Sequence, residues 1–255
     1  MILVEELTVQ AGTFRLSNVS FEVPTGDYGI LMGKTGSGKT TILESICGLK
    51  KVVSGRILLN EKNVTHRKPA ERGIGFVPQD AALFPTMTVR QQLGFALQIR
   101  KWRKTAIESR VAELAALLEI THLLNRSVTG LSGGERQRIA LGRALAPGPA
   151  VLCLDEPLSA LDEETRTGMY NLLKAVQRKT GVTALHITHS LTEANKLGDI
   201  SFVIQEGQVV EMESNHSLEG NSNSAHNGTD KTSRYRKSPK PKSVPEESIS
   251  GTEPQ

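Results

Sequence analysis

The sequence has little cysteine and few aromatic side chains. Of its 255 residues two are cysteine and one is tryptophan, and aromatic residues make up 4%. Two cysteines exclude a disulfide-stapled scaffold. Because Cys47 and Cys153 both fall in apolar stretches, we expect packed thiols in a reducing compartment. A folded part of about 213 residues buries roughly 70% or more of its chain surface, so it needs no disulfide to stabilise it.

Long hydrophobic runs and a strong charge of one sign are also missing. No apolar stretch approaches the roughly 18 residues that a membrane-spanning helix needs. The first residues lack the basic and apolar regions of a signal peptide. The formal net charge of +4 is too small to indicate nucleic-acid binding. We therefore expect neither a membrane span in this chain nor a nucleic-acid partner.

Residues 33–40 read Gly-Lys-Thr-Gly-Ser-Gly-Lys-Thr and fit the phosphate-binding pattern G-x-x-x-x-G-K-[ST]. The apolar stretch 27–32 predicts a buried strand before the loop, and 41–47 predicts a helix after it that ends near Gly48. Glycines let backbone N–H groups turn toward an anion, and the helix N-terminus adds its positive dipole end. The pattern predicts a set of residues around the phosphates of a nucleoside triphosphate: Gly33, Lys34, Thr35, Gly36, Ser37, Gly38, Lys39, Thr40 and Thr41. In that arrangement Lys39 contacts the β- and γ-phosphates and the Thr40 hydroxyl binds Mg²⁺.

A second apolar run, residues 150–154, ends at Asp155-Glu156-Pro157. An unbroken apolar run is typical of a parallel strand covered on both faces, and ligands bind at the carboxyl ends of such strands. Asp155 is the expected partner of Mg²⁺, through water, because Mg²⁺ keeps several waters. Glu156 is then placed to polarise the attacking water. Taken alone, the pair could also be an acidic turn without chemistry.

Further segments follow in a recognisable order. They are Gln79 after 75–78, Leu131-Ser132-Gly133-Gly134-Glu135-Arg136-Gln137, Ser159-Ala160-Leu161-Asp162 and Thr188-His189. With the two motifs above, this order resembles the nucleotide-binding subunit of an ATP-binding cassette (ABC) transporter over about residues 1–213. Residues 72–79 with 82–85 and 87–89 are similar to importer ATPases, and most similar to the molybdate, tungstate and sulfate importer branch.

The resemblance implies a fold and a set of roles. The fold is α/β: a P-loop NTPase (RecA-like) ABC ATPase core with N-terminal antiparallel β-strands and an inserted helical subdomain. Gln79 reaches Mg²⁺ or the lytic water, and His189 contacts the γ-phosphate. Ser132, Gly133 and Gly134 clasp the γ-phosphate bound by a second copy, and Asp162 lies at the seam between the copies.

The family also implies cofactors, partners and a location. ATP and Mg²⁺ are the cofactors, and the transport channel belongs to integral-membrane permease subunits, which are separate chains. The expected partners also include a second copy of this chain and an extracytoplasmic solute-binding protein. The location is the cytoplasmic face of the inner (plasma) membrane. The alternatives are an importer ATPase for another small solute, or a soluble ABC ATPase linked to cofactor assembly or nucleic acid.

Four positions near the motifs have open interpretations. Lys34 stands where the family commonly has proline, so its side chain either touches phosphate or only solvent. Ser190 follows the switch histidine where Asp is usual, which leaves the orientation of His189 open. Phe14 is the candidate adenine-stacking aromatic, with strand packing as the alternative. His186 is interpreted as a packed core histidine.

Residues 80–135 form the predicted helical subdomain, because 90–99 and 105–124 show helical spacing of apolar residues. The charged run 100–104 between them is interpreted as a solvated loop rather than a nucleic-acid platform. The candidate contacts to a permease helix, with subdomain packing as the alternative for each, are Phe84, Pro85, Met87 and Leu93.

Residues 214–255 are predicted to be a disordered polar tail, since their composition cannot bury enough apolar area to offset the entropy of ordering. Basic residues gather between Lys231 and Lys242. They indicate either attraction to anionic lipid or an inert tail. The predicted ATPase domain is residues 1–213.

Overall fold

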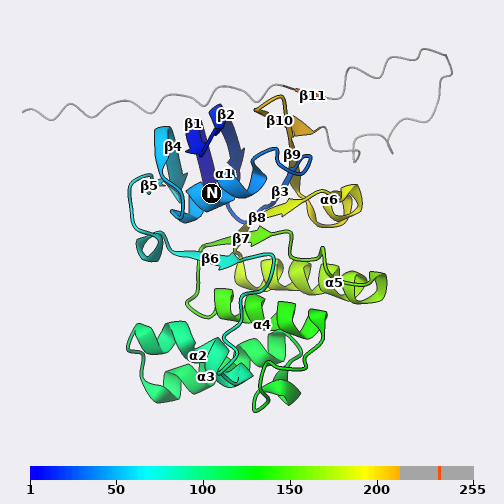
Figure 1. Ribbon diagram of the computed structural model, residues 1–255. Coiled ribbons are helices and arrows are strands. Elements are labelled where there is room, and N and C mark those ends of the chain that lie inside the picture. The colour runs from blue at the N-terminus through cyan, green and yellow to red at the C-terminus, as the bar shows by residue number, and fades with distance from the viewer. Residues whose placement is uncertain (213–234, 237–255) are drawn as a thin grey trace, which may run out of the picture.

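The computed structural model describes residues 1–212 together with 235 and 236, and it arranges them around two β-sheets (Figure 1). The first sheet is antiparallel and has the order β2-β1-β4-β5. Its strands are β1 (Ile2–Ala11), β2 (Phe14–Val23), β4 (Val52–Leu59) and β5 (Lys62–Asn63). The antiparallel strands predicted at the N-terminus are therefore present.

The second sheet has the order β11-β10-β9-β3-β8-β7-β6. Its strands are β3 (Tyr28–Met32), β6 (Ile74–Val77), β7 (Val151–Asp155), β8 (Thr183–Thr188), β9 (Ile200–Gln205), β10 (Gln208–Met212) and β11 (Tyr235–Arg236). The five strands from β9 to β6 run parallel, and β10 turns back antiparallel to β9. Glu206 and Gly207 both have positive φ in the connecting turn, as a tight two-residue hairpin requires.

Six α-helices and two short 3₁₀ helices occur in the described part of the chain. They are α1 (Lys39–Cys47), η1 (Pro69–Glu71), α2 (Val89–Ile99), α3 (Lys104–Leu117), η2 (Thr121–Leu123), α4 (Gly133–Leu145), α5 (Glu163–Thr180) and α6 (Leu191–Leu197). Helix α1 ends at Gly48, which has φ 81°, as predicted. Helix α3 ends earlier than the predicted 124, because Glu119 takes φ 59° and breaks the helical path before η2.

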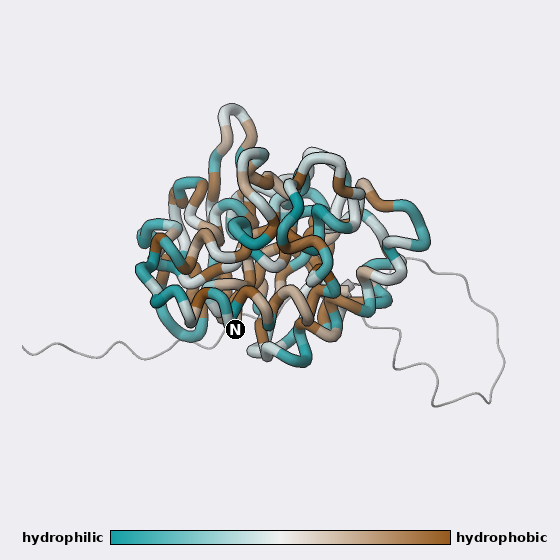
Figure 2. Tube along the Cα trace, turned by 90° about the horizontal axis from the view of Figure 1, so that it is seen from below, coloured by the Kyte–Doolittle hydropathy of each residue, from teal (hydrophilic) through white to brown (hydrophobic). Residues whose placement is uncertain are grey.

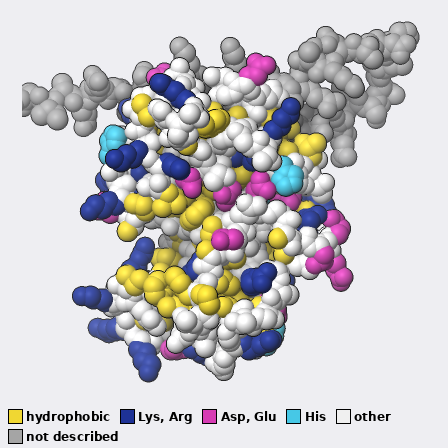
Figure 3. Space-filling model, viewed as in Figure 1, with side chains coloured by type: hydrophobic (Ala, Val, Ile, Leu, Met, Phe, Trp, Pro, Cys, Tyr) yellow, Lys and Arg dark blue, Asp and Glu magenta, His cyan; other side chains and the backbone are white. Residues whose placement is uncertain are grey.

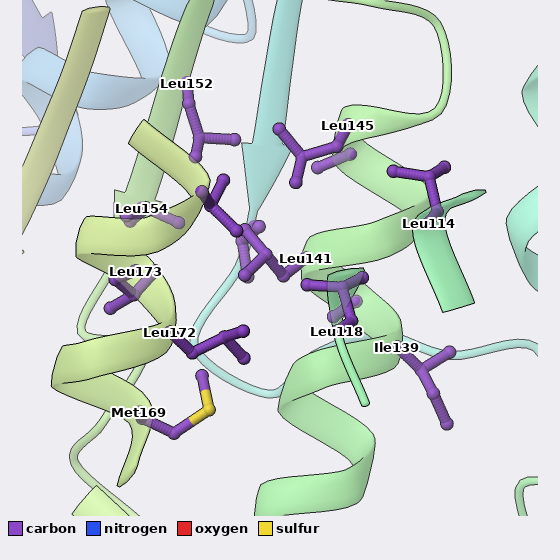
Figure 4. Packing of buried hydrophobic residues seen from close by; sticks show 14 of the residues in the cluster. Leu114, Leu118, Ile139, Leu141, Leu145, Leu152, Leu154, Met169, Leu172 and Leu173 are labelled. Carbon is purple, nitrogen blue, oxygen red and sulfur yellow. The ribbon is translucent and has the colours of Figure 1, made fainter. Parts of the chain in front are cut away.

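Alternate residues of the parallel strands face two different hydrophobic clusters. In β7, Leu152 and Leu154 pack with α3, α4 and α5, whereas Val151 and Cys153 pack with α1 and the antiparallel sheet. Figure 4 shows Leu152 and Leu154 near leucines of α4 and α5. This alternation buries the sheet on both faces, which agrees with the unbroken apolar runs in the sequence.

The chain segment between β6 and α4 contains α2, α3 and η2, and it forms a lobe below α4 at the bottom of Figure 1. Thr88 and Gln91 form a capping box at the start of α2. Seen from below, hydrophobic segments run through the interior while hydrophilic residues gather on outer turns (Figure 2). Both predicted thiols, Cys47 and Cys153, are buried.

Most of the predicted tail lies outside the described residues, so its predicted disorder stays a prediction. Tyr235 and Arg236 are the exception, because they pair with Met212 and Glu211 as β11. Within residues 1–212 and 235–236, no helix has the length and apolar character needed to cross a bilayer.

Candidate functional site

Four predicted functional segments follow neighbouring strands of the parallel sheet. The phosphate loop follows β3, His189 follows β8, Asp155 ends β7 and Gln79 lies two residues after β6. These strands are adjacent in the order β3-β8-β7-β6 and run parallel. Their carboxyl ends therefore meet at one edge, where ligands bind in open α/β sheets.

The phosphate loop folds around its own lysine. The Lys39 ammonium donates to the carbonyl oxygens of Gly33 and Lys34 at 2.9 and 3.1 Å, and the side chain is 5% exposed. The Ser37 hydroxyl is buried without a hydrogen-bond partner. The N-cap residue of α1 is Gly38, which has no side chain to cap the helix. The first N–H groups of α1 therefore have no side-chain acceptor. A buried unpartnered hydroxyl and an uncapped helix start both fit an anion at this loop.

Phe14 lies against this loop from β2. A Cβ on Gly38, whose φ is +98°, would come within 2.9 Å of the Phe14 ring and 2.5 Å of Leu16. Glycine is therefore required here both by the backbone angle and by the close packing. The contact places Phe14 at the loop, and its stacking on adenine stays a prediction. The Lys34 side chain is exposed.

Asp155 and Thr40 bring two oxygens together beside the loop. The Thr40 hydroxyl donates to Asp155 Oδ1 at 3.3 Å. Burial raises the pKa of Asp155 above its ordinary value, and the Thr40 hydrogen bond opposes that shift. A bound cation would offset the same desolvation cost. Mg²⁺ takes one or two protein oxygens together with phosphates and waters, so this pair fits it without a larger cluster of acidic residues.

Glu156 lies between Lys39 and His189. Its Oε1 lies 4.0 Å from Lys39 Nζ and its Oε2 lies 3.2 Å from His189 Nδ1. Glu156 has φ 43°, and the Ser159 hydroxyl donates to its carbonyl oxygen at 2.9 Å. A left-handed non-glycine residue is a strained conformation that is common at active sites.

A cavity of about 260 Å³ opens at this point. Its lining residues are Glu156, Ser159, Arg166, Thr188, His189, Ser190 and Glu193. His189 is largely exposed there, at 63%. Figure 3 shows acidic side chains with a histidine beside them across the middle of one face. Gln79 is exposed at the same edge of the sheet.

Ser132, Gly133 and Gly134 lie on the opposite side of the sheet from the phosphate loop. Ser132 caps α4, whose apolar residues pack in the cluster with α2, α3 and α5, whereas α1 packs in the other cluster. Figure 1 shows α1 and α4 well separated. Among the described residues, no hydrogen bond or ion pair joins the 132–134 segment to this chain's phosphate loop.

The start of α4 is packed tightly onto α5. A Cβ on Gly134 would come within 2.6 Å of Thr165. Asp162 caps α5, accepting from the Thr165 backbone N–H at 2.9 Å and from its hydroxyl at 2.7 Å. Asp162 therefore has a structural role in a single chain, in addition to the predicted position at a subunit seam.

Sequence reasoning missed a buried polar chain beside the cavity. His186 is fully buried as predicted, but its Nδ1 lies 2.9 Å from the Tyr28 hydroxyl and its Nε2 lies 3.3 Å from Glu193 Oε2. Ser190, the departure from the usual Asp, caps α6 by accepting from the Glu193 N–H. The local sequence could not reveal this cluster, because its members lie on β3, β8 and α6 and meet only in the fold.

For one candidate permease contact, Leu93, the structure favours the alternative of packing within the subdomain. Leu93 is fully buried and packs against Gly142 of α4, so it has no surface to offer. Phe84 is 37% exposed, packs on Phe95 at 4.9 Å between ring centroids, and lies under the Arg143 guanidinium. Hydrophobic side chains gather on the helical lobe, below a hollow in the surface (Figure 3).

Comparisons with known proteins agree with this arrangement. The profile of the family described as ABC transporter matches residues 16–159. The molybdate/tungstate import ATP-binding protein WtpC of Thermococcus kodakarensis is 43% identical over 212 residues, which cover 83% of this chain and 64% of that protein. The sulfate/thiosulfate import ATP-binding protein CysA of Thermosynechococcus vestitus is 42% identical over 212 residues, with 83% and 63% covered. The chain therefore spans slightly less than two thirds of the length of each of these relatives.

A solved structure has the same fold. It is a dimeric post-hydrolysis state of the ATP-binding cassette MJ0796 bound to ADP and Pi, with a TM-score of 0.72 at 29% identity, and the match covers 82% of this chain and 96% of that one. The predicted fold, a P-loop ABC core of mixed α/β type, is thus confirmed. On the family profile and the 43% identity to an import ATP-binding protein, this chain belongs to the ABC transporter family.

Proposed function

We propose that this chain is the ATP-hydrolysing subunit of an ABC importer. The observation that carries the proposal is Glu156, which lies between Lys39 and His189 at the edge of the sheet where the phosphate loop also ends. A carboxylate in that position orients a water against the terminal phosphate, while Lys39 and the N–H groups of α1 hold the phosphates.

Each residue has a defined part in this reaction. Lys39 leaves its two carbonyl partners for the β- and γ-phosphates, and the Ser37 hydroxyl gains an acceptor. Thr40 and Asp155 would hold Mg²⁺, with Gln79 at the same edge of the sheet, and the ion would supply positive charge to the phosphate oxygens. Glu156 polarises water, and His189 contacts the γ-phosphate.

Replacing Glu156 tests the chemistry. Glu156→Gln is expected to keep ATP binding and to lose about 10²–10⁴ in turnover, the scale of general acid–base groups. The matched control is Glu164→Gln, an exposed carboxylate at the start of α5. Turnover and ATP affinity are measured on both purified variants. A Glu156→Gln protein that hydrolyses ATP at the wild-type rate removes Glu156 from this role.

The separation of Ser132–Gly134 from the phosphate loop supports a site shared between two copies. In a C₂ pair, the start of α4 in one copy faces the phosphates held by the other, and both sites are equivalent. ATP then shifts the population toward the closed pair. Ser132→Arg is expected to block the pairing that ATP induces in Glu156→Gln, as measured by sedimentation. Thr105→Arg, at an exposed position on α3, is the matched control. Normal closure of the Ser132→Arg protein would show that the shared site is wrong.

The cargo is an oxyanion: molybdate, tungstate or sulfate. The relatives named for import of these anions support this choice. The subunit works at the cytoplasmic face of the inner (plasma) membrane with separate permease chains and an extracytoplasmic solute-binding protein, and Phe84, Pro85 and Met87 contact the permease. A deletion strain is expected to stop accumulating one of the three anions, and only a wild-type copy, not Lys39→Ala, restores it. Unchanged uptake of all three rejects the oxyanion assignment.

A further inference from the structure

Three buried side chains from three different elements connect the sheet to the turn that carries His189. Tyr28 of β3 and His186 of β8 share a hydrogen bond of 2.9 Å, and His186 Nε2 lies 3.3 Å from Glu193 Oε2 on α6. All three side chains are less than 7% exposed. Glu is almost never this deeply buried unless it is paired. The contact with His186 is therefore what allows Glu193 to lie inside the protein.

The surroundings of the Glu193 carboxylate offset the cost of its burial. Burial by itself raises the pKa of Glu193, but the neighbouring His186, Thr188 and Arg166 side chains together hold this pKa below its ordinary value. Arg166 is already engaged, because it donates to Glu163 and to the Leu161 carbonyl oxygen. His186 of β8 is thus the side chain that lies against the carboxylate, at 3.3 Å.

These contacts lie on both sides of His189. Before it, Thr188 ends β8, and its hydroxyl accepts from the Ser190 N–H at 3.0 Å. After it, the Ser190 hydroxyl accepts from the Glu193 N–H at 3.3 Å. Glu193 therefore joins the last residues of β8 to the first turn of α6, and His189 is the one residue between Thr188 and Ser190. Its own side chain reaches Glu156 without further support in the described structure.

We propose that Glu193 and His186 are positioning residues for ATP hydrolysis, which hold the turn between β8 and α6 so that His189 faces Glu156 and the terminal phosphate. The proposal rests on the proposed function of the site. Neither residue touches the nucleotide in this scheme, and Tyr28 orients His186 from the other side. The effect is expected in turnover and not in ATP affinity, because Lys39 and the phosphate loop are on β3 and α1.

Substitutions at Glu193 separate positioning from charge. Glu193→Ala frees the turn, and a displacement near 1 Å lowers turnover by about 10²-fold. Glu193→Gln keeps the shape and one acceptor oxygen, so it should retain most of the rate. Asn195→Ala, at an exposed position on the same helix, is the matched control. Turnover, the KM for ATP and the affinity for a non-hydrolysable ATP analogue are measured for each, with thermal unfolding to establish folding.

A double variant tests the contact with His186. His186→Phe leaves the Glu193 carboxylate buried without its nearest partner, and turnover falls. Adding Glu193→Gln removes that stranded charge. The relative turnover of the double variant should therefore be at least about fivefold higher than the product of the relative turnovers of the two single variants, as expected for residues in contact. This comparison also decides the matter if Glu193→Ala alone fails to fold.

The outcomes distinguish this inference from the function on which it rests. Glu193→Ala with wild-type turnover, while His189→Ala is inactive, overturns the positioning role. Equal loss of turnover and ATP affinity in Glu193→Ala also overturns it, since that indicates a general structural effect. Wild-type turnover in His189→Ala instead contradicts the proposed function of the site.

Discussion

Gly142 allows α4 to approach the helical lobe, and adding one methyl group there should destabilise the protein. A Cβ at this position would come within 2.5 Å of Leu93 Cδ2 and 2.7 Å of Leu118 Cδ1. Carbon atoms in contact prefer about 3.5–4.0 Å, so each methyl must move by roughly 1 Å. Both leucines are fully buried, which leaves their side chains no free space to rotate into.

Two terms of opposite sign decide the result. Overpacking a well-packed core costs about 1–3 kcal/mol, whereas alanine is favoured over glycine inside a helix by about 1 kcal/mol. Gly142→Ala is therefore expected to lower the free energy of unfolding by about 0–2 kcal/mol. Gly168→Ala is the matched control, because Gly168 lies inside α5 with nothing within 4 Å of its added Cβ. That control is expected to gain about 1 kcal/mol from helix propensity alone.

The difference between the two variants isolates the overpacking term. In a domain of this size 1 kcal/mol shifts Tm by about 2–4 °C, so Gly142→Ala should melt about 2–12 °C below Gly168→Ala. Urea unfolding followed by circular dichroism gives the same difference at constant temperature. Equal stability of the two variants would refute the reasoning, since it would mean that the core around Leu93 has room for the methyl.

Three further predictions concern burial, pH and the C-terminal region. Arg72→Met should lower the free energy of unfolding by about 1–3 kcal/mol in urea titrations, because it leaves unsatisfied the four backbone carbonyls to which the buried guanidinium donates, two of them in the last turn of α1. Asp155→Asn should stabilise the protein at pH 7, with a smaller gain near pH 4. The raised pKa of the buried Asp155 makes its ionised form unfavourable above the ordinary value of 3.8, so this cost grows as pH rises through the raised pKa. A chain ending at Glu213 loses the two-residue strand β11 but should keep its fold and ATPase rate, because the predicted chemistry lies upstream, and loss of either would show that residues beyond 213 are needed for folding or activity.

The local motifs allowed much of the site to be predicted from sequence. A glycine-rich loop between a strand and a helix requires left-handed residues and an open helix start, and Gly36, Gly38 and Gly48 have the positive φ angles that this demands. The apolar runs that end in Asp155 and His189 identified two strands, and parallel pairing brought their carboxyl ends together. In these segments the hydrophobic pattern and the residues at the ends of strands and helices were enough, because residues that are neighbours in the sequence determine the local conformation.

The errors and omissions arose where residues distant in the sequence determine the burial or conformation of a position. Leu93 looked like any apolar residue near a partner surface, and only its packing on Gly142 shows that it is buried. The early end of α3 depends on Glu119 taking a left-handed conformation that its residue type does not favour. Nothing in the sequence singled out Glu193, because its neighbours Tyr28 and His186 come from β3 and β8 and meet it only in the folded chain.

The placement of the phosphate loop and Ser132 on opposite sides of the sheet has a genetic consequence. In the proposed pair, each copy contributes its phosphate loop to one site and the start of α4 to the other. A copy disabled at Lys39 still carries an intact α4 start, and a copy disabled at Ser132 still carries an intact loop. Two inactive alleles can therefore complement one another, because the mixed pair contains one complete site, whereas either allele alone contains none.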